Sequence, residues 1–283
     1  MTEQILDHKQ VLSLLPERKS HAHKGDFGKV LLLCGSMGYT GAAYLAAMGA
    51  LRSGAGLVYL GVPESIYAIE AVKLNEAVVF PLPEEKGMLC RQALPKILEL
   101  LPKMDAVLIG CGLGQSQGTL EVLSAVLENA NCPVVVDADG INLLAQHKDL
   151  LRGRTAATVL TPHDGEFTRL MGDKPSNDRT QTAVDTAAAL GCVLVLKGHE
   201  TRISDGTVCF RNPTGNPGMA VGGSGDLLAG MIVGLLGQGI EPVTAAAVAA
   251  WLHGAAGDRC AAELGQYGML PTDMLDVLPR LMK

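Results

Sequence analysis

The chain has 283 residues and a net charge of -6; 48% of its residues are hydrophobic and only 4% are aromatic. An acidic chain lacks the basic surface that attracts nucleic acids or anionic membranes, so we expect neither as a partner. Seven cysteines without a C-x-x-C pair predict reduced thiols rather than a disulfide framework. Because the N-terminus is charged and lacks an apolar core, we expect no signal peptide and a cytoplasmic protein.

Short apolar runs that end in glycine or polar residues recur along the chain and predict the strands of a mostly parallel sheet. In chain order these runs cover residues 29–34, 55–62, 77–82, 105–110, 133–137, 158–161 and 192–197. Helices are predicted within residues 1–20, at 43–54 and 91–101, after the stretch 133–142, from Glu166 onward, and at 227–236, 243–264 and 272–281. An Asp-Gly pair at 205–206 predicts a hairpin. No linker or repeat divides the chain, so we expect one α/β domain over residues 1–283.

A glycine-rich loop before the first of the three C-terminal helices carries a single carboxylate, Asp226. Its residues Gly222, Gly223, Ser224 and Gly225 leave the backbone bare, so their N–H groups can converge on an anion at a helix N-terminus. An acid beside a bound phosphate suits a base that takes a proton from an attacking hydroxyl group. The alternative is that Asp226 only caps the helix. The loop therefore favours phosphoryl transfer as the leading interpretation.

Other predicted strands also end in glycine or polar residues, at the sheet edge where open α/β folds bind ligands. The glycine-rich stretches 35–43 and 110–114 either contact a ligand or form tight turns. Asp137 and Asp139 either hold a hydrated metal ion or orient a substrate, with helix capping as the alternative for Asp139. His163 is either a ligand contact or a structural residue. The chain has neither a G-x-G-x-x-G nor a Walker motif, which weakens dinucleotide-fold and P-loop interpretations.

The chain carries seven short motifs in a fixed order: Lys24-Gly-Asp-Phe-Gly28, Gly35-Ser36 with Thr40-Gly-Ala42, Gly112-Leu-Gly114, Asp137-Ala-Asp139, Thr161-Pro-His163-Asp-Gly-Glu166, Lys197-Gly-His-Glu-Thr201, and Gly218-Met-Ala to Asp226. Each motif is weak alone. The ordered set covers nearly the whole chain and resembles the ADP/ATP-dependent NAD(P)H-hydrate dehydratases, a branch of the ribokinase-like superfamily. The resemblance implies a three-layer α/β/α sandwich with helices on both faces of a mostly parallel central sheet.

The resemblance implies dehydration of the 6S hydrates of NADH and NADPH, called NADHX and NADPHX, back to NAD(P)H. ADP or ATP, with Mg²⁺, would phosphorylate the hydroxyl of the hydrate, and phosphate would then be eliminated. We expect ADP to be preferred. A homotetramer is also implied, together with an NAD(P)HX epimerase on a separate chain. The alternative enzyme is a ribokinase-like kinase for a thiazole or pyridoxal-like alcohol. A nucleotide-binding module without turnover is disfavoured, because binding alone needs no base at Asp226.

The resemblance also implies a role for each matching residue. Asp226 would be the catalytic base, and the substrate contacts would be Ala42, Gly112, Gly114, His163 and Asp226. The contacts to the phosphate donor would be Lys197, Gly198, His199, Glu200, Thr201 and Gly225. The anion hole would be formed by Gly222, Gly223, Ser224 and Gly225. Glu166 would act on magnesium through water, and Cys111 stands where the family has a proline, which predicts a less rigid loop.

Overall fold

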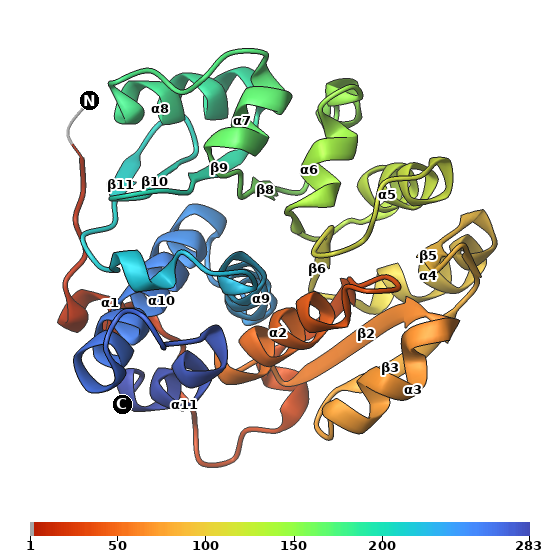
Figure 1. Ribbon diagram of the computed structural model, residues 1–283, viewed down its shortest axis with the longest axis horizontal. Coiled ribbons are helices and arrows are strands. Elements are labelled where there is room, and N and C mark those ends of the chain that lie inside the picture. The colour runs from red at the N-terminus through yellow and green to blue at the C-terminus, as the bar shows by residue number, and fades with distance from the viewer. Residues whose placement is uncertain (1–2) are drawn as a thin grey trace.

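A computed structural model describes residues 3–283 and contains a central nine-stranded sheet (Figure 1). The strand order is β11-β10-β9-β8-β7-β6-β1-β2-β3, and all neighbours are parallel except the two pairs that β10 forms. The strands are β1 (Lys29–Leu33), β2 (Leu57–Pro63), β3 (Val78–Leu82), β6 (Ala106–Ile109), β7 (Val134–Val136), β8 (Thr158–Leu160), β9 (Val193–Leu196), β10 (Arg202–Ser204) and β11 (Cys209–Arg211). A separate small hairpin pairs β4 (Glu84–Glu85) with β5 (Met88–Leu89).

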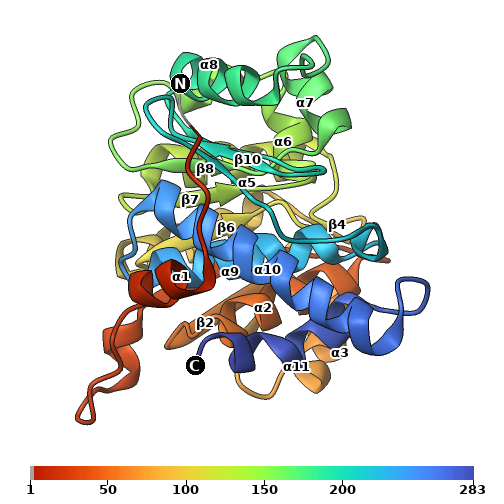
Figure 2. The ribbon, with the colours of Figure 1, turned by 90° about the vertical axis from the view of Figure 1, so that its left-hand side faces the viewer.

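Helices cover both faces of the sheet, so the molecule has three layers (Figure 2). One layer contains α1 (His8–Leu14), α2 (Thr40–Arg52), α3 (Glu64–Lys73), α9 (Ser224–Gly237), α10 (Pro242–Leu264) and α11 (Pro271–Leu281). The other contains α4 (Leu94–Leu100), α5 (Gln117–Asn129), α6 (Asp139–Leu144), α7 (Asp164–Met171) and α8 (Arg179–Leu190). In the part of the chain that the structure describes, no helix combines the length and apolar character needed to cross a bilayer.

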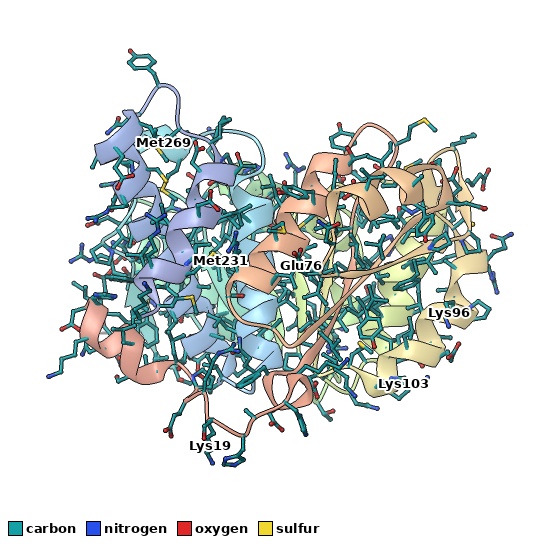
Figure 3. The ribbon with its side chains drawn as sticks, turned by 90° about the horizontal axis from the view of Figure 1, so that it is seen from below. Lys19, Glu76, Lys96, Lys103, Met231 and Met269 are labelled. Atoms are coloured by element: carbon teal, nitrogen blue, oxygen red, sulfur yellow. The ribbon has the colours of Figure 1, made fainter. Side chains whose placement is uncertain are left out.

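The central strands are apolar on both sides because each side faces a helical layer. In β1, Val30 and Leu32 join the core beneath α2 and α9, whereas Leu31 and Leu33 join the core beneath α4 and α5. Side chains alternate along a strand, so a continuous apolar run is needed to fill both cores. Met231 of α9, labelled in Figure 3, belongs to the same core as Val30 and Leu32. The run of leucines in β1 therefore follows from its central position.

The three-layer fold, the seven predicted core strands and the Asp-Gly hairpin are confirmed, with shifts at element boundaries. The second strand starts at Leu57 rather than Ala55, because the N–H of Ala55 bonds back to the carbonyl of Ala50 at the end of α2, and the N–H of Gly56 bonds to the carbonyl of Phe27 ahead of β1. The predicted helix at 91–101 opens as a 3₁₀ turn over Arg91–Ala93 before α4. Helices α3, α5 and α8 were not predicted. In α3, the buried residues are only Ile66 and Glu70, too few to give an apolar stripe.

Helices α2 and α9 approach each other closely where glycine replaces a side chain. A β-carbon at Gly230 would lie 2.1 Å from the carbonyl oxygen of Ala46, and one at Gly49 would lie 2.5 Å from the carbonyl oxygen of Leu227. Both distances are far below van der Waals contact. The glycines of α9 therefore determine how closely its backbone approaches α2.

We expect Gly230→Ala to destabilise the protein by about 1–3 kcal/mol or more, because the added methyl group forces the two backbones apart. The measurement is the change in Tm by calorimetry. Gly41→Ala is the matched control, since Gly41 lies in α2 and has no atom within 4 Å of its would-be β-carbon. An unchanged Tm in Gly230→Ala would show that the helices can separate without loss.

Candidate functional site

The site forms where β7, β8 and β9 end, at the same edge of the sheet, opposite the first turn of α9. Three charged side chains meet here, two that directly follow strands and one, Glu166, from the first turn of α7. Lys197 follows β9, and its Nζ lies 2.9 Å from Asp137 Oδ1 and 3.7 Å from Glu166 Oε2. Thr161, which follows β8, donates its hydroxyl to the same Asp137 oxygen at 2.6 Å. Burial disfavours the ammonium of Lys197, but the charges of Asp137 and Glu166 outweigh it and raise the pKa of Lys197.

Asp226 stands in the first turn of α9 and faces this cluster. Burial, followed by the negative charge of Asp137, raises the pKa of Asp226 to about 6; the Cys111 thiol and the Lys197 ammonium oppose that shift only in part. Asp226 forms no ion pair with any residue from 3 to 283. The carboxylate is therefore ionised at neutral pH, yet poised to accept a proton.

The glycine loop before α9 presents backbone N–H groups, but that of Ser224, implied as part of the anion hole, bonds to the carbonyl of Val221 at 3.3 Å. Gly223 has a φ of +96°, which turns the chain into the helix. Among the described residues, the N–H groups of Gly222, Gly223, Gly225 and Asp226 have no hydrogen-bond acceptor. Such a group of N–H donors at a helix N-terminus binds anions. A β-carbon at Gly225 would lie 3.2 Å from Lys197 Nζ, so the ammonium lies directly beneath the loop.

His253 was missed by the sequence interpretation, although it lies beside this loop. Its Nε2 is 3.4 Å from the hydroxyl of Ser224. Burial lowers the pKa of His253 to about 4, so the ring is neutral. The only signal in the sequence is a lone histidine inside the apolar, alanine-rich helix α10.

Two of the residues implied as substrate contacts, Ala42 and Gly112, lie beside each other. A β-carbon at Gly112 would lie 2.8 Å from the β-carbon of Ala42, so the two residues are adjacent. The hydroxyl of Ser36 donates to the carbonyl of Gly112 at 2.7 Å, and the N–H of Gly114 donates to Asp139 Oδ2 at 2.9 Å. Asp139 thus braces the 110–114 loop as well as opening α6.

The residue between the two aspartates has an uncommon backbone conformation. Ala138 has a φ of +48° and a ψ of -115°. An L-residue with a side chain rarely adopts a positive φ, and such residues gather at functional sites. The turn allows Asp137 to face the cluster while Asp139 reaches the neighbouring loop.

His163 and Glu166 form a reciprocal cap at the start of α7. Nδ1 of His163 accepts the N–H of Gly165 at 3.0 Å, while Glu166 Oε2 accepts the N–H of His163 at 2.9 Å. The His163 side chain is 54% exposed, whereas that of Glu166 is 7% exposed. His163 is therefore both a structural cap and an accessible ring, so the two interpretations of this residue do not exclude each other.

The residues implied as contacts to the phosphate donor divide into two groups. Lys197 points into the carboxylate cluster beneath Gly225. His199 and Glu200 instead line an open hollow of about 600 Å³. The other residues lining this hollow are Asn177, Asp178, Arg179, Thr180 and Arg202, which the sequence analysis did not single out because they carry no local motif.

The site fits a phosphate better than it fits a directly bound magnesium ion. The free N–H groups of the glycine loop suit phosphate oxygens. Magnesium prefers oxygen ligands and retains several waters. Asp137 is already paired with Lys197, and Glu166 accepts a backbone N–H. Glu166 therefore suits an indirect contact to magnesium through water.

A mostly parallel sheet with helices on both faces, and a glycine loop that ends in a carboxylate at a helix N-terminus, define a ribokinase-like protein. The family model for NAD(P)H-hydrate dehydratase matches residues 30–280. The chain therefore belongs to the NAD(P)H-hydrate dehydratase family.

Relatives of known name support this assignment. A bifunctional NAD(P)H-hydrate repair enzyme of Moorella thermoacetica is 46% identical over 277 residues, which cover 96% of this chain and 52% of the relative. An ADP-dependent (S)-NAD(P)H-hydrate dehydratase of Bacillus subtilis is 38% identical, covering 96% of this chain and 95% of the relative. The chain thus spans about half the length of the bifunctional relative and nearly all of the Bacillus protein.

A solved structure resembles the whole chain. The ADP/ATP-dependent NAD(P)H-hydrate dehydratase of Bacillus subtilis, co-crystallised with ATP/Mg²⁺, superposes with a TM-score of 0.86 at 34% identity. The match covers 99% of this chain and 98% of the other.

The raised pKa of Asp226 predicts a pH-dependent stability. Because the folded-state pKa of about 6 lies above the ordinary value of 3.8, the folded protein loses stability as pH rises between these values. Asp226→Asn removes this loss. We expect the variant to be more stable than the wild type by about 1–3 kcal/mol at neutral pH, with a smaller difference at pH of about 5.

The measurement is Tm against pH for both proteins. Asp205→Asn is a control of opposite sign. Burial acts to raise the pKa of Asp205, but the N–H groups of Val208 and Thr207 outweigh it and lower that pKa, so this variant loses stability at neutral pH. A parallel pH dependence of wild type and Asp226→Asn would refute the raised pKa.

Proposed function

We propose that this chain dehydrates the 6S hydrates of NADH and NADPH back to NAD(P)H in a nucleotide-dependent repair reaction. The observation that carries the proposal is the placement of Asp226, a carboxylate with a raised pKa, directly beside four free N–H groups at the N-terminus of α9. A base next to an anion hole is what transfer of a phosphoryl group to a hydroxyl requires.

In the proposed reaction Asp226 accepts the proton of the hydrate's hydroxyl as its oxygen attacks the terminal phosphorus of the donor nucleotide. The N–H groups of Gly222, Gly223 and Gly225 stabilise the charge on the transferring phosphoryl oxygens. Phosphorylation turns a poor leaving group into a good one. Loss of phosphate, together with the adjacent ring proton, then restores the dihydronicotinamide double bond.

The donor would be ADP or ATP, and we propose ADP as the preferred donor. Its phosphates would lie between the glycine loop and Lys197, while its adenylate would contact the stretch 198–201. Bound magnesium would neutralise phosphate charge, with Glu166 orienting its water shell. Lys197 holds Asp137 and Glu166 in place and adds positive charge beneath Gly225, which supports this placement of the donor.

The dinucleotide hydrate would bind on the opposite side of Asp226. Ala42, Gly112 and Gly114 present little side-chain bulk there, so a flat nicotinamide ring can approach the backbone. His163 presents an accessible ring at the same edge of the sheet. We further propose that residues 1–283 act as one functional domain in a cytoplasmic homotetramer, served by an NAD(P)HX epimerase on a separate chain.

The first test mixes the protein with NADHX, Mg²⁺ and either ADP or ATP, and follows the near-ultraviolet absorbance of NADH. We expect a nucleotide-dependent rise that Asp226→Asn reduces by about 10²–10⁴-fold, because the variant lacks a base. Binding of the nucleotide to the variant is the control for folding. A flat trace with intact nucleotide binding would rule out the dehydratase, and thiazole or pyridoxal-like alcohols would then be tried as kinase substrates.

The pH dependence offers a separate test of the same base. Because protonated Asp226 cannot accept a proton, we expect kcat/KM to fall about tenfold per pH unit below an apparent pKa near 6. An acidic limb near the ordinary value of 3.8 would contradict this role for Asp226. The rate measured at two enzyme concentrations and after preincubation at each pH controls for inactivation.

A further inference from the structure

Cys111 lies in the carboxylate cluster, at the end of β6, and the proposed reaction does not use it. Its Sγ, a carboxylate oxygen of Asp137 and one of Asp226 all lie within 4.8 Å of one another. Cys111 is fully buried, and Asp137 is 1% exposed. Three potential metal ligands from three separate elements thus converge on one point.

The geometry of this group suits a tetrahedral site. Sγ of Cys111 is 3.6 Å from Asp137 Oδ2. In a tetrahedral zinc site with Zn–S near 2.3 Å and Zn–O near 2.0 Å, sulfur and oxygen are about 3.5 Å apart. Lys197 and Thr161 occupy the other oxygen of Asp137, Oδ1, so the hydrogen-bond partner of Oδ2 is the Cys111 thiol, whose proton a bound cation would replace.

The charges also favour a divalent cation. Asp137 and Asp226 carry two negative charges, a bound Cys111 thiolate would add a third, and Lys197 supplies one positive charge. A divalent ion brings these four side chains to neutrality, and Glu166, which also pairs with Lys197, adds further negative charge beside them. Thiolate ligands select zinc or cadmium over magnesium and calcium, which prefer oxygen ligands.

We propose that Cys111, Asp137 and Asp226 form a binding site for a thiophilic divalent cation such as Zn²⁺ or Cd²⁺. Binding displaces the thiol proton to solvent, and water completes the fourth position. A bound ion occupies the carboxylate of Asp226. Binding of the ion does not depend on the proposed function, but its effect on activity does. If Asp226 is the base, the bound ion inhibits the reaction by occupying it.

The test titrates the full-length protein, free of nucleotide and magnesium, with CdCl₂ and follows the ultraviolet charge-transfer band of the cadmium–thiolate bond. We expect one such ion per chain. Cys111→Ser should abolish the band, and Asp226→Asn, which keeps the thiol, should weaken cadmium binding about tenfold or more. Cys132→Ser is the matched control, because Cys132 is a free cysteine outside the cluster and should leave the band unchanged.

A band that persists in Cys111→Ser would overturn the proposal, as would equal cadmium affinity in Asp226→Asn and wild type. Circular dichroism of each variant confirms folding, and the Asp226→Asn result decides the matter if Cys111→Ser is unfolded. Inhibition by ZnCl₂ is measured separately, relative to the metal-free rate. If the ion binds at these ligands without slowing the reaction, the site stands and the role of Asp226 as base fails.

Discussion

A single ammonium group, that of Lys197, faces all three carboxylates of the site. Lys197 lies among the carboxylates of Asp137, Glu166 and Asp226, but it forms close ion pairs only with the first two. Buried charges are tolerated only when they are paired, so the third carboxylate is left with a raised pKa. The reactivity proposed for Asp226 is thus a consequence of its burial first, and then of a local shortage of positive charge.

The topology of the sheet brings these groups together. Strands β7, β8 and β9 are parallel neighbours, so the residues that follow them, Asp137, Thr161 and Lys197, emerge side by side. Helix α9 supplies Asp226 from the opposite side, and its N-terminus adds free N–H donors. The charged side chains that follow the strands and the N–H donors of the helix N-terminus therefore lie around the same point.

Local motifs made much of this site predictable from the sequence, whereas contacts between residues far apart in the chain could not be predicted. The glycine loop and Asp226 were recognisable because the chemistry needs bare backbone and a carboxylate in succession. The pairing of Asp137 with Lys197 joins residues 60 apart, and no local pattern announces it. His253 was missed for the same reason, since its neighbour Ser224 belongs to another helix.

The fold shows the same division between local and distant information. Strands buried on both faces were found because a short, continuous apolar run that ends in glycine is typical of a strand between two helical layers. Helix α3 was missed because it buries little, and the start of β2 was misplaced because the backbone bonds of Ala55 to Ala50 and of Gly56 to the distant Phe27 determine it. Roles for single residues rest on the resemblance to the dehydratases, and the experiments above decide them.

The glycines between α2 and α9 also bear on which parts of the site can move during the reaction. Ala42 lies in the first turn of α2 and Asp226 in the first turn of α9, and the two helices are in direct backbone contact. The residue proposed to contact the hydrate, Ala42, and the proposed base, Asp226, therefore lie on two helices whose backbones touch. The spacing between them is set when the chain folds, so no hinge between α2 and α9 has to close before reaction, and any closing motion must come from elements outside this pair.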